Sequence, residues 1–328
     1  MKSKKGVIGI QFNWVFILIA GVLILSFFGS LVLKGKEVSD LTMAETVLTN
    51  MQTIMTGAEV SVRTINPIKI PDKEIRVDCD SLSVGRISKP ITKNTIVFSP
   101  ESIKGRTLLA WALDWNTPYH VANFLYLTTL NIRYIFVDSG NDYAEELYNL
   151  LPNEINKKII EPENIKDLKD TGNYLKFIFF NNPKPEDITL SSDISKISNS
   201  RVSAINVISG TNEIEFYEKK GAQFELVGKA NYLGDPMILG AMFSGNLEDY
   251  KCNLEKAFNK LNIVSKVYEK RTNSLRKLYA GTGCISYYDT SPFSIDYSKA
   301  SIADIKLAIK SIETSNMYLQ SSSCPTIY

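Results

Sequence analysis

The sequence is poor in histidine and lacks the common catalytic motifs. His120 is the only histidine among 328 residues, so a Ser-His-Asp or Cys-His mechanism must use it or is excluded. No Walker A loop, Gly-x-Gly-x-x-Gly or His-Glu-x-x-His motif is present, which removes the usual signals for nucleotide and zinc enzymes. An Asn-x-Ser/Thr sequon is also missing, so N-glycosylation at that signal is excluded. We therefore expect no cofactor, and the sequence favours a non-enzymatic role.

The chain has no excess charge of one sign. It holds 37 basic and 35 acidic residues, a net charge of +2, so it lacks the basic footprint of a nucleic-acid-binding protein. Low-complexity segments and solenoid repeats are absent as well. Nucleic acid is not an expected partner, and the sequence does not identify a small molecule.

Charge is missing altogether from Gly6 to Leu33, a run of 28 residues. As a helix this run is roughly 42 Å long, which exceeds the roughly 30 Å of a bilayer's hydrocarbon core. It is too long for a secretory signal and ends without a small-residue cleavage site. We predict a cytoplasmic basic leader over residues 1–6 and a transmembrane helix over 7–33.

The apolar pattern continues beyond the span. Apolar residues recur at helical spacing through Gly57, which predicts an amphipathic extension of the same helix over 34–57. Lysines at 2, 4 and 5 place the N-terminus in the cytoplasm, although Lys34 and Lys36 weaken this asymmetry. The expected location is the cell membrane, with a single pass and an extracytoplasmic ectodomain.

The N-terminal residues resemble a type IV pilin with a class III signal peptide. Lysines precede Gly6, and an apolar helix begins at Val7; the resemblance implies cleavage between these two residues. Bacterial pilins usually have Glu at the fifth mature position, where this chain has Gln11. The whole chain resembles archaeal pilin-like surface proteins. An uncleaved signal anchor is the alternative interpretation.

The four cysteines all follow the predicted span. Cys79, Cys252, Cys284 and Cys324 have neither zinc-site nor Cys-x-x-Cys spacing, so two disulfides in an oxidising compartment are expected. Four free thiols in a cytoplasmic domain are the alternative.

Geometry removes one of the three possible pairings. The pattern over 246–280 predicts one long helix, which would separate Cys252 from Cys284 by about 45 Å. A second helix over 298–319 is expected to return antiparallel and to bring Cys324 to Cys252. We therefore predict Cys252 with Cys324 and Cys79 with Cys284, the alternative being Cys79 with Cys252 and Cys284 with Cys324.

Apolar runs alternate with helical patterns between the two helical ends. This alternation predicts a three-layer α/β ectodomain with a mostly parallel sheet over 70–240, followed by a disulfide-tied helical hairpin over 246–328. The expected strands cover 74–79, 95–98, 132–137, 174–180 and 202–208, with a hairpin formed by 213–217 and 223–227. The expected helices between them cover 118–130, 142–151 and 185–197.

Two sets of side chains could carry chemistry. Asp138 follows a buried strand and Asp142 lies one turn later, so both are candidate ligands for a divalent metal at the carboxyl edge of the sheet. The same residues also suit an ordinary turn. Trp111, Trp115 and Tyr119 could form an aromatic surface for a sugar or protein partner, or could belong to the core.

The sequence therefore favours a membrane-anchored extracytoplasmic structural or interaction protein, a pilin-like surface subunit with protein partners along its N-terminal helix. The alternative is a membrane-tethered α/β enzyme or small-ligand receptor that uses Asp138 and Asp142.

Overall fold

The computed structural model describes residues 18–19, 21–22, 24–26, 39, 41–57, 65–70, 73–138, 140, 142–169 and 173–328. The cleavage signal expected at Gly6, Val7 and Gln11 lies outside these residues, as does most of the span predicted over 7–33. None of the helices formed by the residues within these ranges is both long and apolar enough to cross a bilayer.

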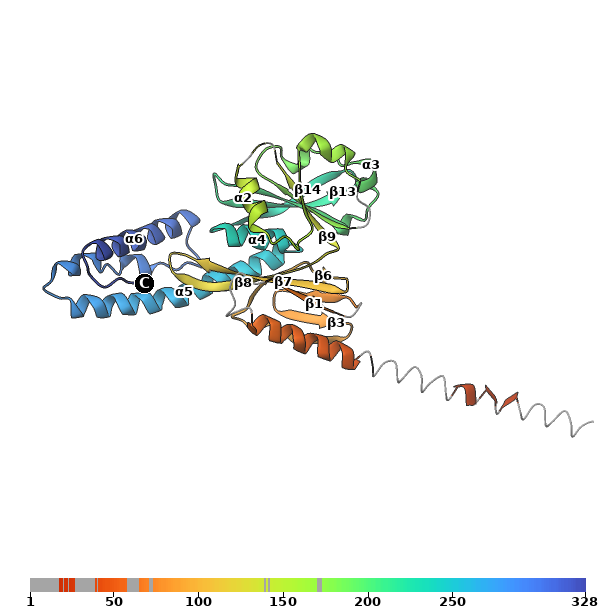
Figure 1. The fold of residues 1–328 in the computed structure, drawn as a ribbon, viewed down its shortest axis with the longest axis horizontal. Coiled ribbons are helices and arrows are strands. Elements are labelled where there is room, and N and C mark those ends of the chain that lie inside the picture. The colour runs from red at the N-terminus through yellow and green to blue at the C-terminus, as the bar shows by residue number, and fades with distance from the viewer. Residues whose placement is uncertain are drawn as a thin grey trace, which may run out of the picture.

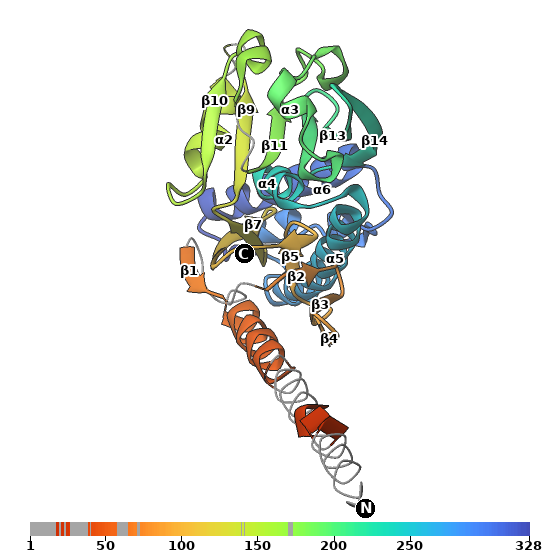
Figure 2. The ribbon, with the colours of Figure 1, turned by 90° about the vertical axis from the view of Figure 1, so that its right-hand side faces the viewer.

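A body of three β-sheets lies between an N-terminal helix and a C-terminal helical arm (Figure 1). The six-stranded sheet lies farthest from the N-terminal helix (Figure 2). In spatial order its strands are β10 (Lys157–Ile160), β9 (Ile132–Val137), β11 (Tyr174–Phe179), β12 (Val202–Ile208), β13 (Glu213–Lys220) and β14 (Gln223–Asn231).

The six-stranded sheet is mixed. β10, β9, β11 and β12 run parallel, whereas β13 and β14 pair antiparallel. Gly221 has a φ of 65° in the turn between β13 and β14, a conformation that glycine adopts without strain. One face packs against α2 (Asp142–Leu150) and α4 (Asp235–Phe243), and the other packs against α3 (Ser192–Ser195) and nearby 3₁₀ turns. Those turns are η1 (Pro162–Asp167), η2 (Pro185–Asp187) and η3 (Asn199–Arg201).

Two four-stranded sheets form the part of the body nearer the N-terminal helix. The central sheet contains β1 (Ile65–Lys69), β7 (Thr107–Asn116), β8 (His120–Thr129) and β5 (Ile96–Phe98), in that order. The small antiparallel sheet contains β4 (Ile87–Pro90), β3 (Ser81–Val84), β2 (Ile75–Val77) and β6 (Ser102–Ile103). β5 pairs with β8 and leaves its other edge toward the helical arm.

β7 supplies side chains to two cores because successive residues of a strand point to opposite faces. Trp111 and Trp115 enter a core shared with α4, the six-stranded sheet and the arm. Leu108 and Ala110 enter a second core shared with the small sheet and the N-terminal helix. The central sheet therefore holds the two ends of the molecule together.

The N-terminal helix over 41–57 has the predicted amphipathic pattern. Ala44, Val47, Leu48, Met51 and Met55 are buried in the second core. Polar contacts fix the helix against β4: the Lys89 ammonium donates to Thr49 Oγ1 at 2.7 Å, and Gln52 donates to the Pro90 carbonyl at 3.2 Å.

The arm begins with α5 (Leu247–Leu278), whose first turns are bonded to strand backbones. Asn246 caps the helix by accepting from the Asp249 N–H at 2.8 Å. Asn253, which is buried, accepts from the Val97 N–H at 3.1 Å. Val97 lies on the open edge of β5, so the amide of Asn253 satisfies a strand donor that has no neighbouring strand.

The arm ends with α6 (Ile302–Ser321), which runs in the same direction as α5. The chain first returns through two 3₁₀ turns, η4 (Gly283–Tyr287) and η5 (Ser291–Ser294), to the middle of α5. There Asn262 donates to the Asp296 carboxylate and accepts from the Tyr297 N–H. At the other end of α6, the Tyr318 ring stacks on Tyr287 beside the end of α5. The expected antiparallel return of the second helix is therefore wrong.

Several predicted elements are confirmed and others are corrected. The buried strands at 132–137, 174–180 and 202–208 are present, and so is the hairpin of β13 and β14. The protein is mixed α/β as predicted. Four strands of its large sheet run parallel, but β13 and β14 and almost all pairings in the other two sheets are antiparallel, so the sheets as a whole are mixed and not mostly parallel. Residues 118–130 form strand β8, not a helix, and 185–197 contain only η2 and the short α3.

Replacing Asn253 by Ala should destabilise the protein by about 1–3 kcal/mol, because the buried Val97 N–H would lose its acceptor. The measurement is chemical denaturation of the purified chain. Asn259→Ala on the exposed side of the same helix is the matched control and should change the unfolding free energy by less than about 0.5 kcal/mol. Equal effects of the two substitutions would contradict the assigned role of Asn253.

Candidate functional site

The predicted carboxylate pair lies at the carboxyl edge of the six-stranded sheet, but its geometry is that of a turn. Asp138 follows β9, and its Oδ1 accepts from the Gly140 N–H at 3.1 Å. Asp142 begins α2 and is exposed. Among the residues described, the only group of three His, Cys, Asp or Glu side chains close enough to share a metal is Cys79, Asp80 and Cys252. That group does not include Asp138 or Asp142, and both of its cysteines are disulfide-bonded. The described residues therefore give no support to a metal site at Asp138 and Asp142.

Trp111, Trp115 and Tyr119 do not form an aromatic surface and belong to the core, the second of the two possibilities considered for them. These side chains are 4%, 1% and 3% exposed. Trp115 donates to the Leu233 carbonyl at 3.1 Å, and the Tyr119 ring stacks on Tyr268 of α5 with centroids 4.1 Å apart. Residues 111 and 115 share a face in a strand as they do in a helix, and in β7 that face is covered by α4 and α5.

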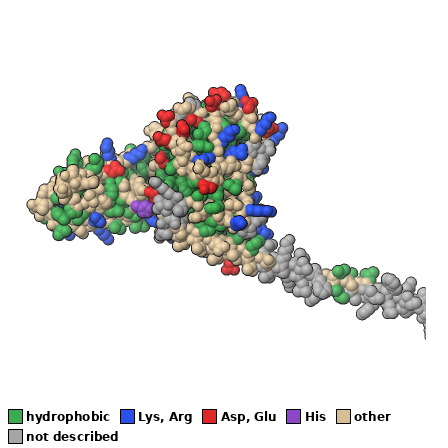
Figure 3. All heavy atoms as spheres, in the orientation of Figure 1, with side chains coloured by type: hydrophobic (Ala, Val, Ile, Leu, Met, Phe, Trp, Pro, Cys, Tyr) green, Lys and Arg blue, Asp and Glu red, His purple; other side chains and the backbone are tan. Residues whose placement is uncertain are grey.

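His120 lies on the surface where the arm leaves the body (Figure 3). Its Nδ1 is 3.2 Å from Asn116 Oδ1 across the turn between β7 and β8. No hydrogen bond from a hydroxyl, thiol or carboxylate group to this ring is found in the described part of the chain. It therefore shows no triad geometry.

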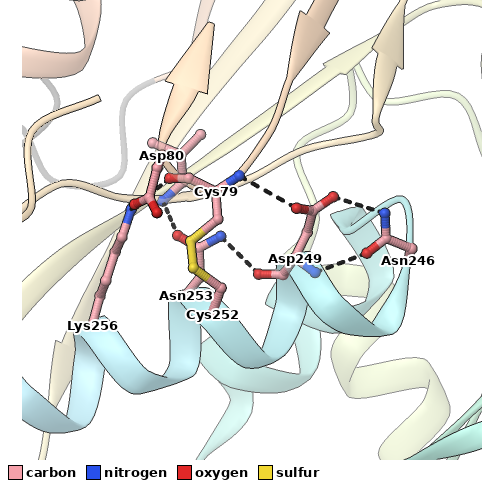
Figure 4. Close-up of a disulfide and its surroundings, with 8 residues drawn as sticks. Cys79, Asp80, Asn246, Asp249, Cys252, Asn253 and Lys256 are labelled. Atoms are coloured by element: carbon pink, nitrogen blue, oxygen red, sulfur yellow. Dashed lines mark hydrogen bonds and ion pairs between the residues drawn. A yellow bond between two sulfur atoms is a disulfide. The ribbon is translucent and has the colours of Figure 1, made fainter. Parts of the chain in front are cut away.

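The four cysteines form two disulfides, as expected, but the predicted partners are wrong. Cys79 is bonded to Cys252 and Cys284 to Cys324. The prediction failed because the return along α5 is made by the 3₁₀ segment and not by α6, so α6 delivers Cys324 to the end of the arm. The first bond joins the loop between β2 and β3 to the second turn of α5 (Figure 4).

Side chains of α5 next to the first disulfide bind both the N–H and the carbonyl of Cys79. Asp249 Oδ1 accepts from the Cys79 N–H at 3.3 Å, and the Lys256 ammonium donates to the Cys79 carbonyl. Lys256 is also ion-paired with Asp80 at 3.0 Å. These contacts, visible in Figure 4, occupy the polar groups around the bond and are structural.

Three lysines from the six-stranded sheet donate to carbonyls where helices end, a pattern that the sequence reading missed. The Lys157 ammonium donates to the Tyr148 and Leu151 carbonyls at the end of α2. The Lys219 ammonium donates to the carbonyl of Ser195, the last residue of α3, and to that of Ile197, two residues later. A cation at a helix C-terminus is favoured because the unpaired carbonyls there carry partial negative charge.

Lys176 is the third of these lysines and has the fewest contacts. Its ammonium donates to the carbonyl of Ser244, which caps α4, at 3.1 Å and lies 5.8 Å from the centre of the Phe216 ring. The residue is 6% exposed. Burial lowers the pKa of Lys176 to about 8, because desolvation disfavours its charged form.

A cavity of about 360 Å³ lies beside Lys176, toward the amino ends of the parallel strands. Its walls come from the six-stranded sheet, from the end of α4 and from the segments that contain β2 and β6. The polar residues among its lining include Glu74, Ser102, Lys104, Lys176, Arg201 and Ser203. This edge of the sheet is opposite to the one that carries Asp138.

Buried polar groups at the other edge of the sheet are already paired. The Glu215 carboxylate accepts from Asn206, Tyr217 and Lys229 at 2.9, 2.8 and 2.7 Å. Burial raises the pKa of Glu215, but these three donors outweigh it and hold the pKa below its usual range. Asn206 also accepts from the Asn181 N–H at 2.7 Å and so fixes the loop after β11.

One sequence signal could have identified Lys176. It is the only charged residue in the apolar run from Tyr174 to Phe180, and an isolated lysine in such a strand must be buried with a partner or exposed by a kink. The cavity itself had no such signal, because its walls come from segments far apart in the chain.

Comparison of the chain with protein-family models, with curated proteins and with solved structures finds no match. Its function must therefore be inferred from the chemistry and arrangement of its own residues.

Peptide mapping without reduction should recover Cys79 linked to Cys252 and Cys284 linked to Cys324. Replacing the first pair by serines should lower the melting temperature more than replacing the second pair. The first bond closes a loop of 173 residues and the second a loop of 40. The loss of chain entropy in the unfolded state then stabilises the folded protein by about 5 kcal/mol for the first bond and about 4 kcal/mol for the second. A peptide joining Cys252 to Cys324 would contradict the described connectivity.

The stability of the protein should rise with pH between about pH 8 and pH 10.4 because of Lys176. Below this window both folded and unfolded chains hold the proton; within it the folded chain releases its proton first. Denaturation of wild type, Lys176→Met and Lys176→Arg at pH 7 to 10.5 tests this. The side chains at position 176 of both variants do not titrate in this window. Across it, the unfolding free energy of the wild type should therefore rise by up to about 3 kcal/mol relative to that of either variant. A constant difference across the window would show that Lys176 keeps its ordinary pKa.

Proposed function

We propose that the protein is a membrane-anchored, extracytoplasmic structural or interaction protein, a pilin-like surface subunit. The observation that carries the proposal is the division of the N-terminal region into two parts. Residues 41–57 form a helix that buries one apolar stripe in the body. Residues 6–33 contain no charge at all, as expected for a segment that is surrounded by lipid.

The disulfides support an extracytoplasmic location. Both bonds lie in the part of the chain after the proposed anchor, and such bonds persist in oxidising compartments. The lysines at positions 2, 4 and 5 support a cytoplasmic N-terminus.

Exposed apolar side chains on the arm support contacts with other proteins. Ile263 and Val267 lie one turn apart on α5 and are 62% and 61% exposed. Leu307 and Met317 on α6 are also exposed. Exposed apolar side chains that are neighbours on one helix face, such as Ile263 and Val267, are a feature of protein interaction sites. The buried Trp111, Trp115 and Tyr119 do not contribute to it.

Gln11 supports a minor or non-polymerising role. An amide can hydrogen-bond but cannot neutralise the amino terminus of a neighbouring subunit, as the Glu of bacterial pilins does. The rival role, a tethered enzyme or small-ligand receptor at Asp138 and Asp142, has no observation in its favour, because the Asp138 carboxylate accepts from its own turn.

Protease treatment of intact cells should cleave the chain after residue 36 and leave an N-terminal fragment in the membrane fraction. Lysed cells treated in parallel provide the control for protease access. If the body remains intact in whole cells while a known surface protein is cut, the proposed topology is wrong.

Electron microscopy of the purified protein and of cell-surface preparations tests the assembly state. We expect the chain as single particles or as a sparse component of filaments built from another subunit. The matched variant Gln11→Glu restores the carboxylate and should increase incorporation. Abundant filaments of the wild-type chain alone would contradict a non-polymerising role.

A further inference from the structure

The hydrogen-bonding capacity of Lys176 is only partly used. An ammonium has three donors, and the carbonyl of Ser244 is the only acceptor for Lys176 among the described residues. Lys219, buried in the same sheet, has three acceptors: the carbonyls of Ser195 and Ile197 and the side chain of Asn199. Both lysines bind a carbonyl at a helix end, so the smaller number of acceptors at Lys176 results from its own surroundings.

Lys176 lines the cavity together with two other residues that can hydrogen-bond to a ligand, Ser203 and Arg201. Ser203 is the register partner of Lys176 on β12, so its side chain points to the same face and also lines the cavity. Arg201 ends η3, directly before β12. Its guanidinium donates to the Asn173 carbonyl at 3.0 Å and lies 5.0 Å from the centre of the Tyr174 ring. Hydroxyl, guanidinium and ammonium groups thus line one wall.

The charges around the cavity leave Lys176 without an anionic partner. Glu74 and Glu101 are the acidic residues in its lining. The Glu74 carboxylate accepts a hydrogen bond from Ser102 at 2.6 Å and is ion-paired with Lys104 at 3.4 Å and with Arg76 at 3.7 Å. Glu101 is exposed, and no ion pair joins either carboxylate to Lys176 within the described ranges. A buried cation without a counter-charge is costly, and an anion in the cavity would remove that cost.

We propose that this cavity binds a small organic anion, whose carboxylate or phosphate group is held by Lys176 with Ser203 and Arg201. Charge-assisted hydrogen bonds of this kind are shorter and stronger than neutral ones. Ile132, Met242 and Phe243, which also line the cavity, can accommodate an apolar portion of the ligand. The volume of about 360 Å³ suits a small molecule. This inference does not depend on where the protein resides.

The test is calorimetric titration of the purified full chain in detergent micelles with inorganic phosphate, acetate and benzoate. At least one of the three anions should bind saturably and raise the melting temperature. Preference for phosphate would identify a phosphoryl ligand, and preference for benzoate over acetate would identify a carboxylate with an apolar body.

Two variants address the site and one serves as a control. Lys176→Met should weaken binding at least about tenfold, since it removes the cation. Ser203→Leu keeps Lys176 and its bond to Ser244 but fills the cavity, and should abolish binding. Lys157→Met, which removes a lysine of the same helix-end type away from the cavity, should leave binding unchanged. Absence of saturable binding to the wild type, or equal binding by wild type and Lys176→Met, would overturn the proposal.

Discussion

The attachment of the first turns of α5 to the edge of the central sheet and to the turn between β2 and β3 is the constraint on which the rest of the structure depends. β5 ends the central sheet, and a strand edge must have its backbone groups paired, covered or exposed to water. Asn253 supplies the acceptor for Val97, Asp249 supplies one for Cys79, and the disulfide at Cys252 makes the same junction covalent. A helix held at one end in this way can extend beyond the body, and the return segment and α6 then pack against its free part.

The sequence was sufficient for those elements whose pattern has one explanation. Continuous apolar runs predicted β9, β11 and β12, and the cap at Asn246 predicted the start of α5. β8 was assigned wrongly because it is buried on both faces, and a nearly continuous apolar run of this length does not distinguish a strand from a buried helix. The disulfide partners were wrong for a different reason: they depend on the path of an irregular segment, which has no periodicity to read.

The same distinction applies to the candidate sites. The position of Asp138 at the end of a strand was predictable, because chain order alone determines it. Its engagement in its own turn, and the burial of Trp111, Trp115 and Tyr119, depend on elements far away in the sequence. Lys176 had a local signal, a lone charge in an apolar strand, but its cavity is assembled from six separate segments of the chain. Sequence reasoning could locate unusual residues here and could not say what surrounds them.

The first disulfide also determines how the molecule would carry mechanical tension. A pull applied to the arm of a tethered protein would enter the body at the second turn of α5. From there the shortest covalent route passes through Cys252 to Cys79 and then along β2 to β1 and the N-terminal helix. The loop of 173 residues that contains the whole six-stranded sheet lies outside this route. This route meets the cavity at Lys176 only through the segment of Glu74 and Arg76, so the walls formed by the six-stranded sheet and α4 would stay largely unloaded under such a pull.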